Sequence, residues 1–195
     1  MRDWTGGTRV EKMEQNAISF DSRELAARLG GSGEEVQSIV YNSVLESISA
    51  SYSVTLAPVC VEGDLVYLCG SEINSSDLAK TVSGCKNVVL LVGTLGFGLD
   101  RYISSLGVRS ASAQFVADAL ADALIEGVCD IAQADVGESF RLGNRFSPGY
   151  GNLPLSVGRD IVYFTRSDVS LGIRYTDSGL ALPKKTVTAI IPVFE

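Results

Sequence analysis

The chain has 195 residues, of which 46% are hydrophobic and 20% charged, a balance typical of a globular domain. A chain of this length buries roughly 70% of its unfolded surface on folding, so its core needs neither a disulfide nor a metal ion. Its formal net charge of −7 argues against a surface that binds phosphate backbones, so we expect no nucleic acid partner.

Histidine is absent, and the four cysteines (Cys60, Cys69, Cys85 and Cys129) show no C-x-x-C pairing. Zinc sites need closely spaced Cys and His ligands, so we expect no metal site. The commonest general acid and base near neutral pH is also missing, and we assign no catalytic residue. We interpret the cysteines as small buried residues of a protein from a reducing compartment.

The first 16 residues are polar, lack periodicity and contain no apolar segment typical of a signal peptide. No apolar run approaches the ~20 residues that a membrane-spanning helix needs. We therefore expect a soluble, cytoplasmic protein without a membrane partner. Residues 1–16 are predicted to be a flexible lead-in, and residues 17–195 to form one domain.

Helical and strand patterns alternate in the first half of the chain. Asp21 followed by Glu24 forms a capping box for a helix over residues 21–29. A second helix is predicted after Ser32, with an apolar face made by Val36, Ile39, Val40, Val44 and Ile48. The segments VTLAPVCV and LVYLCG predict a hairpin. A short helix capped by Ser76 and a buried strand at NVVLLVG are expected to follow.

The strongest helical pattern covers residues 112–134, and its apolar side consists of Val116, Leu120, Ala123, Leu124, Val128 and Ile131. Ile103 and Leu106 indicate a short helix before it, and another helix is predicted over residues 155–167. The last segments, GIRYT, GLAL and TVTAIIPVF, are strand-like. This irregular mixture favours an α+β fold over a doubly wound sheet.

A glycine-rich segment, GTLGFG, follows the NVVLLVG strand and precedes a helix. Its spacing of Gly93, Gly96 and Gly98 differs from the dinucleotide motif G-x-G-x-x-G, and the lysine of a P-loop is missing. We interpret it as a tight turn from strand to helix.

Four carboxylates recur every four residues along the long predicted helix: Asp118, Asp122, Glu126 and Asp130. Such spacing usually marks a solvated helix face, although like charges repel one another in an isolated helix. One of the four could therefore face a cation, and the spacing does not decide which.

The loop RFSPGYGNLP, residues 145–154, is both rigid and polar. Pro148 fixes its own φ, whereas glycines allow a ligand or another backbone to approach closely. A guanidinium such as Arg145 recognises carboxylate or phosphate, and a ring such as Tyr150 offers a face to a cation or a flat heterocycle. These residues point to a small zwitterionic or anionic ligand, and a purely structural loop is the alternative.

The loop resembles the R-x-[SA]-P-G-Y signature of the activation domain of cobalamin-dependent methionine synthase. Further segments resemble the same family: CKNVVLLVGTLGFGLD its strand and Thr-Leu-Gly turn, ADALADALIEGVCD its helix with a glutamate, and LGIRYTDSGLALPKKTVTAII its C-terminal block. SRELAARLG fits the free-standing version of this domain, encoded apart from a shortened synthase. The resemblance covers residues 17–195 and implies a twisted, mainly antiparallel sheet with flanking helices.

The resemblance implies a module that binds S-adenosylmethionine and supports the reductive methylation, or reactivation, of cob(II)alamin. In this family the domain presents S-adenosylmethionine to the cobalt while a flavodoxin- or ferredoxin-type reductant supplies an electron. The implied partner is a cobalamin-binding methionine synthase that lacks its own activation domain. Cobalamin would come only through that partner, because the family motif that ligates cobalt needs a histidine and this chain has none.

Five residues match the family's binding positions. Arg145 would take the ligand's carboxylate, and Glu126 would face its ammonium or sulfonium charge. Ser147, Gly149 and Tyr150 match loop positions that contact the ligand through backbone and side chain.

Three positions depart from the family pattern. Gly158 stands where a longer polar residue is expected, and Thr186 replaces the more usual serine. The family has a further acidic residue shortly before the arginine, and Glu138 lies close to that position but not in register with it. These departures keep an alternative open: a non-catalytic S-adenosylmethionine-binding or scaffold module for another corrinoid protein.

Overall fold

A computed structural model of the chain describes residues 7–14, 17–18 and 34–194. Its helices are α2 (Glu34–Ser47), α3 (Ser76–Thr81), α4 (Phe97–Gly107), α5 (Ala111–Gly137), α6 (Val157–Phe164) and α7 (Ser167–Ser170). Its strands are β1 (Arg9–Lys12), β2 (Ser51–Pro58), β3 (Cys60–Glu62), β4 (Leu65–Leu68), β5 (Ser71–Asn74), β6 (Asn87–Thr94), β7 (Arg141–Leu142), β8 (Arg174–Tyr175), β9 (Ala181–Leu182) and β10 (Thr186–Phe194). None of these helices is long and apolar enough to cross a bilayer.

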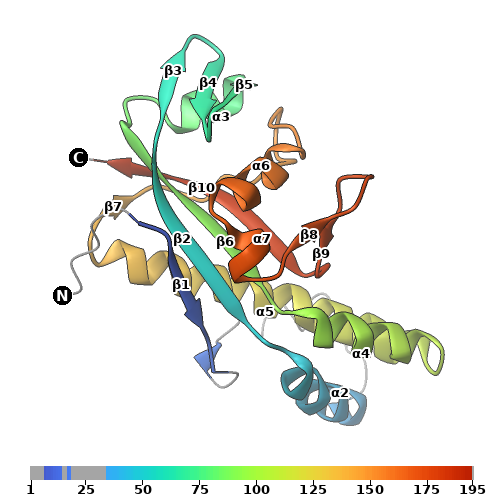
Figure 1. Cartoon of the computed structure of the whole chain (residues 1–195). Coiled ribbons are helices and arrows are strands. Elements are labelled where there is room, and N and C mark those ends of the chain that lie inside the picture. Colours follow the sequence, from blue (N-terminus) through green and yellow to red (C-terminus); the bar gives the residue numbers. More distant parts are fainter. Residues whose placement is uncertain (1–6, 15–16, 19–33, 195) are drawn as a thin grey trace.

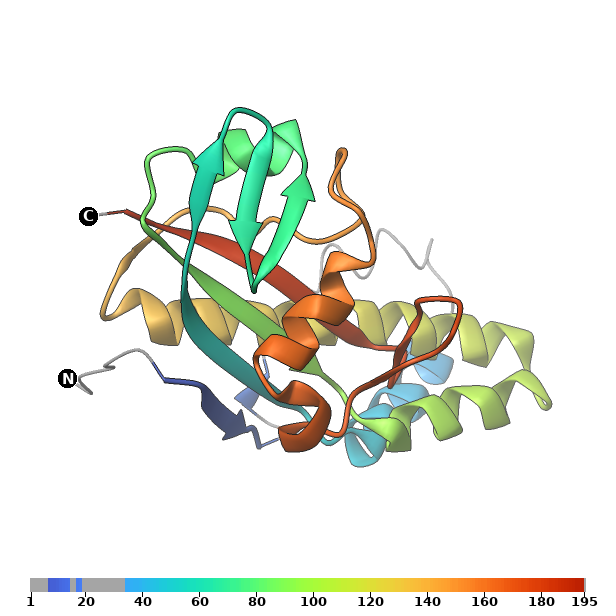
Figure 2. The same ribbon diagram turned by 45° about the horizontal axis from the view of Figure 1, so that its top comes forward.

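A five-stranded antiparallel sheet in the order β1-β2-β6-β10-β7 is the centre of the fold. The long helix α5 lies along one face, whereas α6 and α7 lie on the other (Figure 1). The small sheet β3-β4-β5 and α3 stand together at one end of the molecule (Figure 2). The expected α+β fold, with a curled antiparallel sheet and flanking helices, is confirmed.

The strand β6 is apolar without alternation because both of its faces are buried. Successive side chains of a strand point to opposite faces. Val89 and Leu91 therefore pack into the core beneath α2, α4 and α5, while Leu90 and Val92 pack into the core on the α6 side. Full burial of one such side chain contributes about 1.5–3 kcal/mol to the stability of the fold. Because β6 contributes side chains to both cores, it connects them.

The apolar stripe predicted for the long helix holds in α5. Val116, Leu120, Leu124 and Val128 are buried in the core that α5 shares with α2, α4 and the sheet, while Ala123 and Ile131 are partly exposed. Small residues such as Ala117, Ala121 and Gly127 are buried as well. The predicted α2 face is also confirmed where the structure describes it, because Val40, Val44 and Ile48 are buried. The helix predicted over residues 21–29 lies outside the described residues.

Within the segment expected to be a lead-in, residues Arg9–Lys12 form the edge strand β1, which pairs with β2. An edge strand needs backbone partners rather than an apolar run, so its polar sequence gave no periodic signal. Arg9 forms an ion pair with Asp135 of α5, and the Tyr52 hydroxyl donates to the same carboxylate over 2.9 Å. These contacts attach β1 to the rest of the fold.

Smaller differences concern the helix ends and one cysteine. The predicted helix over residues 155–167 is split into α6 and α7, because Arg166 has the left-handed φ of 58°. The cap of α3 is Ser75 rather than Ser76, and its hydroxyl accepts from the Leu78 amide. Cys129 is buried as interpreted, and burial raises its thiol pKa to about 12, but Cys60 is exposed.

The glycine-rich segment is a tight turn between β6 and α4, as interpreted. Gly96 adopts the left-handed φ of 83° at the start of α4. A methyl group on Gly98 would overlap the backbone oxygen of Ser47, since α4 begins against the end of α2. Packing therefore accounts for these two glycines.

We predict that Gly98→Ala lowers the free energy of unfolding by about 1–3 kcal/mol, because the two helices must separate to admit the methyl group. Urea denaturation measures this change. Gly137→Ala is the matched control, since an added methyl group there meets no atom within 4 Å, and its stability should equal or slightly exceed that of the wild type. A Gly98→Ala protein as stable as the control would contradict the packing argument.

Candidate functional site

The edge of β10 positions Arg145. The Gly143 amide donates to the Pro192 carbonyl over 2.9 Å, and Phe146 exchanges two backbone hydrogen bonds of 2.9 Å with Ile190. This segment therefore runs along β10 like a further piece of strand. Because neighbouring side chains alternate, Phe146 packs into the core on the α6 side and Arg145 turns toward α5.

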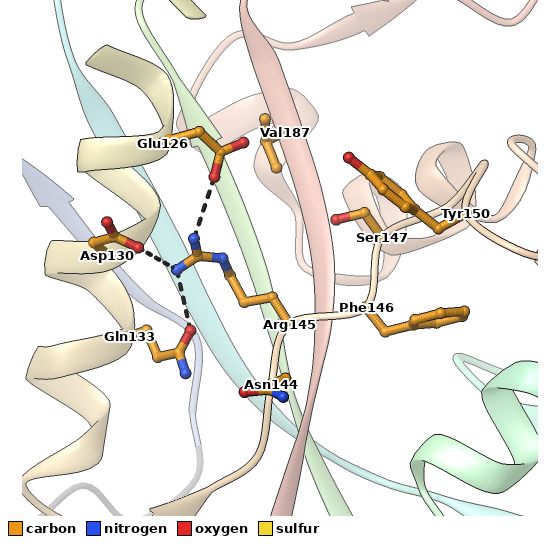
Figure 3. A pocket seen from close by; sticks show the side chains of 9 residues that line it. All are labelled: Glu126, Asp130, Gln133, Asn144, Arg145, Phe146, Ser147, Tyr150 and Val187. Carbon is orange, nitrogen blue, oxygen red and sulfur yellow. Dashed lines mark hydrogen bonds and ion pairs between the residues drawn. The ribbon is translucent and has the colours of Figure 1, made fainter. Parts of the chain in front are cut away.

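The guanidinium of Arg145 lies against one face of α5 (Figure 3). Its Nη1 atom is 2.7 Å from Asp130 Oδ1 and donates to Gln133 Oε1 over 3.1 Å. Its Nη2 atom donates to Glu126 Oε2 over 3.2 Å. The three partners are four and three residues apart, so they share a helix face.

Arg145 is much less exposed than its acidic partners. Its side chain is 22% exposed, against 58% for Glu126 and 69% for Asp130. Burial alone lowers the pKa of Arg145, but the hydrogen bond to Asp130 and the charges of Asp130 and Glu126 outweigh it, so the pKa is raised. The site therefore holds a permanent cation beside two carboxylates, an arrangement suited to a ligand that carries charges of both signs.

Two adjoining cavities share Glu126 and the start of the loop, and one of them contains this cation. One has a volume of about 440 Å³ and is lined by Glu126, Asp130, Gln133, Asn144, Arg145, Phe146, Ser147, Tyr150 and Val187. The other has about 680 Å³, shares Glu126, Ser147, Tyr150 and Val187, and extends to Leu155, Tyr175 and Leu180 near the β8–β9 hairpin. We call both together the Arg145 cleft, which is charged at one end and largely apolar at the other.

Four of the five predicted binding residues line this cleft: Glu126, Arg145, Ser147 and Tyr150. Tyr150 is 67% exposed, and Figure 3 shows its ring near Ser147 and apart from the guanidinium. Gly149 does not line the cleft; its φ is 92° and its amide donates to the Leu153 carbonyl over 2.9 Å. The contact of each residue with a ligand stays a prediction.

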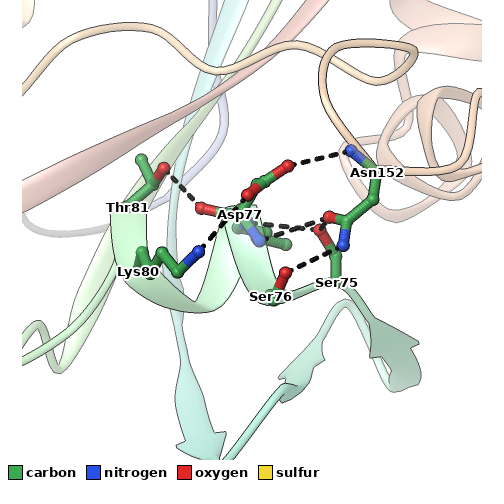
Figure 4. Close-up of polar contacts among 7 residues, drawn as sticks. Ser75, Ser76, Asp77, Lys80, Thr81 and Asn152 are labelled. Carbon is green, nitrogen blue, oxygen red and sulfur yellow. Dashed lines mark hydrogen bonds and ion pairs between the residues drawn. The ribbon is translucent and has the colours of Figure 1, made fainter.

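The stiffness of the loop comes from a cluster of hydrogen bonds to α3 (Figure 4). The Asn152 side chain accepts from Ser75 Oγ over 2.6 Å and from the Asp77 amide over 3.2 Å, and donates to Ser76 Oγ over 2.9 Å. In return, Asp77 accepts from the Asn152 amide over 3.1 Å. Gly151 has the left-handed φ of 53°, and a methyl group there would overlap the Asp77 carboxylate. Residues after Tyr150 thus anchor the loop.

The acidic face of α5 is paired with cations along its whole length. Besides the two carboxylates that contact Arg145, Asp118 and Asp122 lie 2.9 and 2.6 Å from the Lys185 ammonium. Lys185 is only 14% exposed, and it precedes β10. The interpretation as a merely solvated face is therefore incomplete, since each carboxylate is partly exposed and also ion-paired.

Sequence reasoning did not assign Asp130, Gln133 or Asn144 to the site. The first two could have been found from their spacing of four and seven residues from Glu126, which places them on the same helix face. Asn144 gave no signal beyond its position next to Arg145.

The departure at Gly158 has a packing reason. A methyl group at this position would lie 2.9 Å from both Thr188 Oγ1 and the Tyr175 hydroxyl. Burial raises the pKa of Tyr175 to about 12, although a hydrogen bond to Thr188 opposes this shift. The tyrosine of the β8–β9 hairpin thus occupies the space that a longer side chain at position 158 would need.

Comparison with known proteins identifies the fold. No protein-family model and no curated protein matches the chain. Among solved structures, the crystal structure of the MetH reactivation domain bound to AdoHcy (S-adenosylhomocysteine) is similar, with a TM-score of 0.69 and 14% sequence identity. The match covers 95% of this chain and 78% of that chain. The fold implied by the sequence resemblance is therefore confirmed.

We predict that Asn152→Ala lowers the free energy of unfolding by about 1–2 kcal/mol, because its partners on α3 lose their hydrogen bonds. Amide hydrogen exchange should also become faster at Tyr150 and Leu153, whose amides close the loop. Asn74→Ala, at an exposed position of the neighbouring β5, is the matched control and should change neither quantity. Unchanged exchange in Asn152→Ala would show that the loop does not depend on this anchor.

Proposed function

We propose that this protein is an S-adenosylmethionine-binding module that supports the reductive methylation of cob(II)alamin on a separate cobalamin-dependent methionine synthase. The observation that carries the proposal is the Arg145 cleft, a fixed cation flanked by carboxylates, on a fold shared with a reactivation domain crystallised with AdoHcy. AdoHcy differs from S-adenosylmethionine by one methyl group and one positive charge, so a site for one suits the other.

The chemistry of S-adenosylmethionine matches the two ends of the cleft. Its carboxylate suits the guanidinium of Arg145, and its ammonium or sulfonium suits the Glu126 carboxylate. Its flat adenine ring needs an apolar surface, which Leu155, Leu180 and the Tyr150 ring offer at the other end. Ser147 and Gly149 remain predicted contacts of the loop.

The corrinoid would belong to the partner. Histidine is absent from this chain, so no residue here matches the family's cobalt ligand. The role left to the chain is to bind the methyl donor and orient it toward the partner's cofactor. The partners in this proposal are a methionine synthase that lacks its own activation domain and a flavodoxin- or ferredoxin-type reductant.

The second candidate is a non-catalytic S-adenosylmethionine-binding or scaffold module for another corrinoid protein. It is favoured by two observations. Arg145 already contacts Asp130, Glu126 and Gln133, and Tyr175 fills the space beside Gly158. Such a module would dock on its partner without supporting methyl transfer.

We expect isothermal titration calorimetry to show saturable binding of S-adenosylmethionine, which Arg145→Ala weakens about 10- to 100-fold. That range corresponds to the loss of a hydrogen bond between charged groups, about 1.5–3 kcal/mol. The control is Arg109→Ala, which removes the same charge at an exposed position between α4 and α5 and should bind like the wild type. Equal affinity of Arg145→Ala and wild type would refute the assigned carboxylate contact.

Transfer of a labelled methyl group separates the two candidates. The protein is mixed with S-adenosylmethionine, a cobalamin-loaded methionine synthase lacking its activation domain, and a reduced flavodoxin. Label in the corrinoid that depends on this protein supports the reactivation role. Ligand binding without label transfer supports the non-catalytic module.

A further inference from the structure

Asp130 makes the shortest of the contacts to the Arg145 guanidinium, at 2.7 Å from Nη1. The other two contacts, to Gln133 and Glu126, are 3.1 and 3.2 Å long. Both hydrogens of Nη1 thus have partners on α5, and the guanidinium is turned toward the helix (Figure 3). The group assigned to a ligand carboxylate is already bonded to a carboxylate of the chain.

We propose that Asp130 competes with the ligand carboxylate for Arg145, and so sets the affinity for ligands that carry a carboxylate. This inference rests on the proposed binding of S-adenosylmethionine in the Arg145 cleft. The ligand carboxylate reaches Arg145 as Asp130 swings away into solvent, and Asp130 returns when the ligand leaves.

Charge balance supports this role. One guanidinium beside two carboxylates carries a local net charge of −1, before any ligand arrives. A third carboxylate at the same guanidinium would stand within a few ångströms of Asp130, where like charges repel even in water. The repulsion acts whichever edge of the guanidinium the ligand uses, so affinity for a carboxylate rises when Asp130 is neutral or displaced.

Exposure distinguishes Asp130 from Glu126. The Asp130 side chain is 69% exposed, more than that of Glu126, so breaking its ion pair with Arg145 costs little free energy. Glu126 lines both cavities of the cleft, whereas Asp130 lines only the one that contains Arg145. Glu126 is therefore placed to contact the ligand's positive charge, and Asp130 to occupy the cation between binding events.

The test compares two ligands and three proteins by calorimetry at low ionic strength. AdoHcy carries the carboxylate, and 5′-methylthioadenosine lacks both the carboxylate and the ammonium. Asp130→Asn should bind AdoHcy about two- to fivefold more tightly than the wild type, since an exposed ion pair of this kind is weak. Its affinity for 5′-methylthioadenosine should not change, and added salt should reduce the gain for AdoHcy.

Asp118→Asn is the matched control. It removes the same charge from the same helix face about 18 Å away along α5, and Lys185 keeps its contact with Asp122. It should bind both ligands like the wild type. Thermal unfolding of Asp130→Asn should match that of the wild type, because Arg145 retains Glu126 and Gln133.

The outcomes separate this inference from the proposed function. If the wild type binds AdoHcy and Asp130→Asn binds it equally well or more weakly, the competitor role is overturned while the proposed function stands. If Asp130→Asn is the only one of the three proteins that binds AdoHcy, the competitor role is supported in its strongest form. No binding by any of the three proteins would overturn the proposed function and this inference with it.

Discussion

The pairing of the segment before the loop with the edge of β10 is the constraint on which the site depends. This pairing turns Phe146 into one core and Arg145 toward α5 on the opposite side. The position of α5 is fixed in turn by its buried stripe against the sheet. A slip of one residue along β10 would exchange the two directions and remove the cation from the cleft.

The long periodic elements could be predicted from the sequence because their patterns reflect burial directly. The β6 run and the α5 stripe are examples, since each has a buried side that only apolar residues satisfy. The strand β1 could not be predicted, because its contacts are backbone pairing and an ion pair to Asp135, a residue distant in sequence. Local patterns carry no information about such partners.

Only the local features of the candidate site could be predicted, because local patterns do not identify partners that are distant in sequence. The restriction that Pro148 places on the loop could be read from the sequence, but the anchor of the loop on α3 joins Asn152 to residues about 75 positions earlier. The four carboxylates of the acidic face could be seen in the sequence, yet the two cations that they contact come from the loop and from the residue just before β10. Charge spacing on a helix shows which residues share a face and leaves their partners undetermined.

The central claim is that the Arg145 cleft binds the ligand with its carboxylate on the guanidinium. A crystal structure of the protein with AdoHcy tests it most directly. We predict density for the ligand between α5 and the loop, with its carboxylate on Arg145, its ammonium near Glu126 and the Asp130 carboxylate turned into solvent. Ligand density elsewhere on the protein, with Arg145 still bonded to Asp130, would contradict the claim.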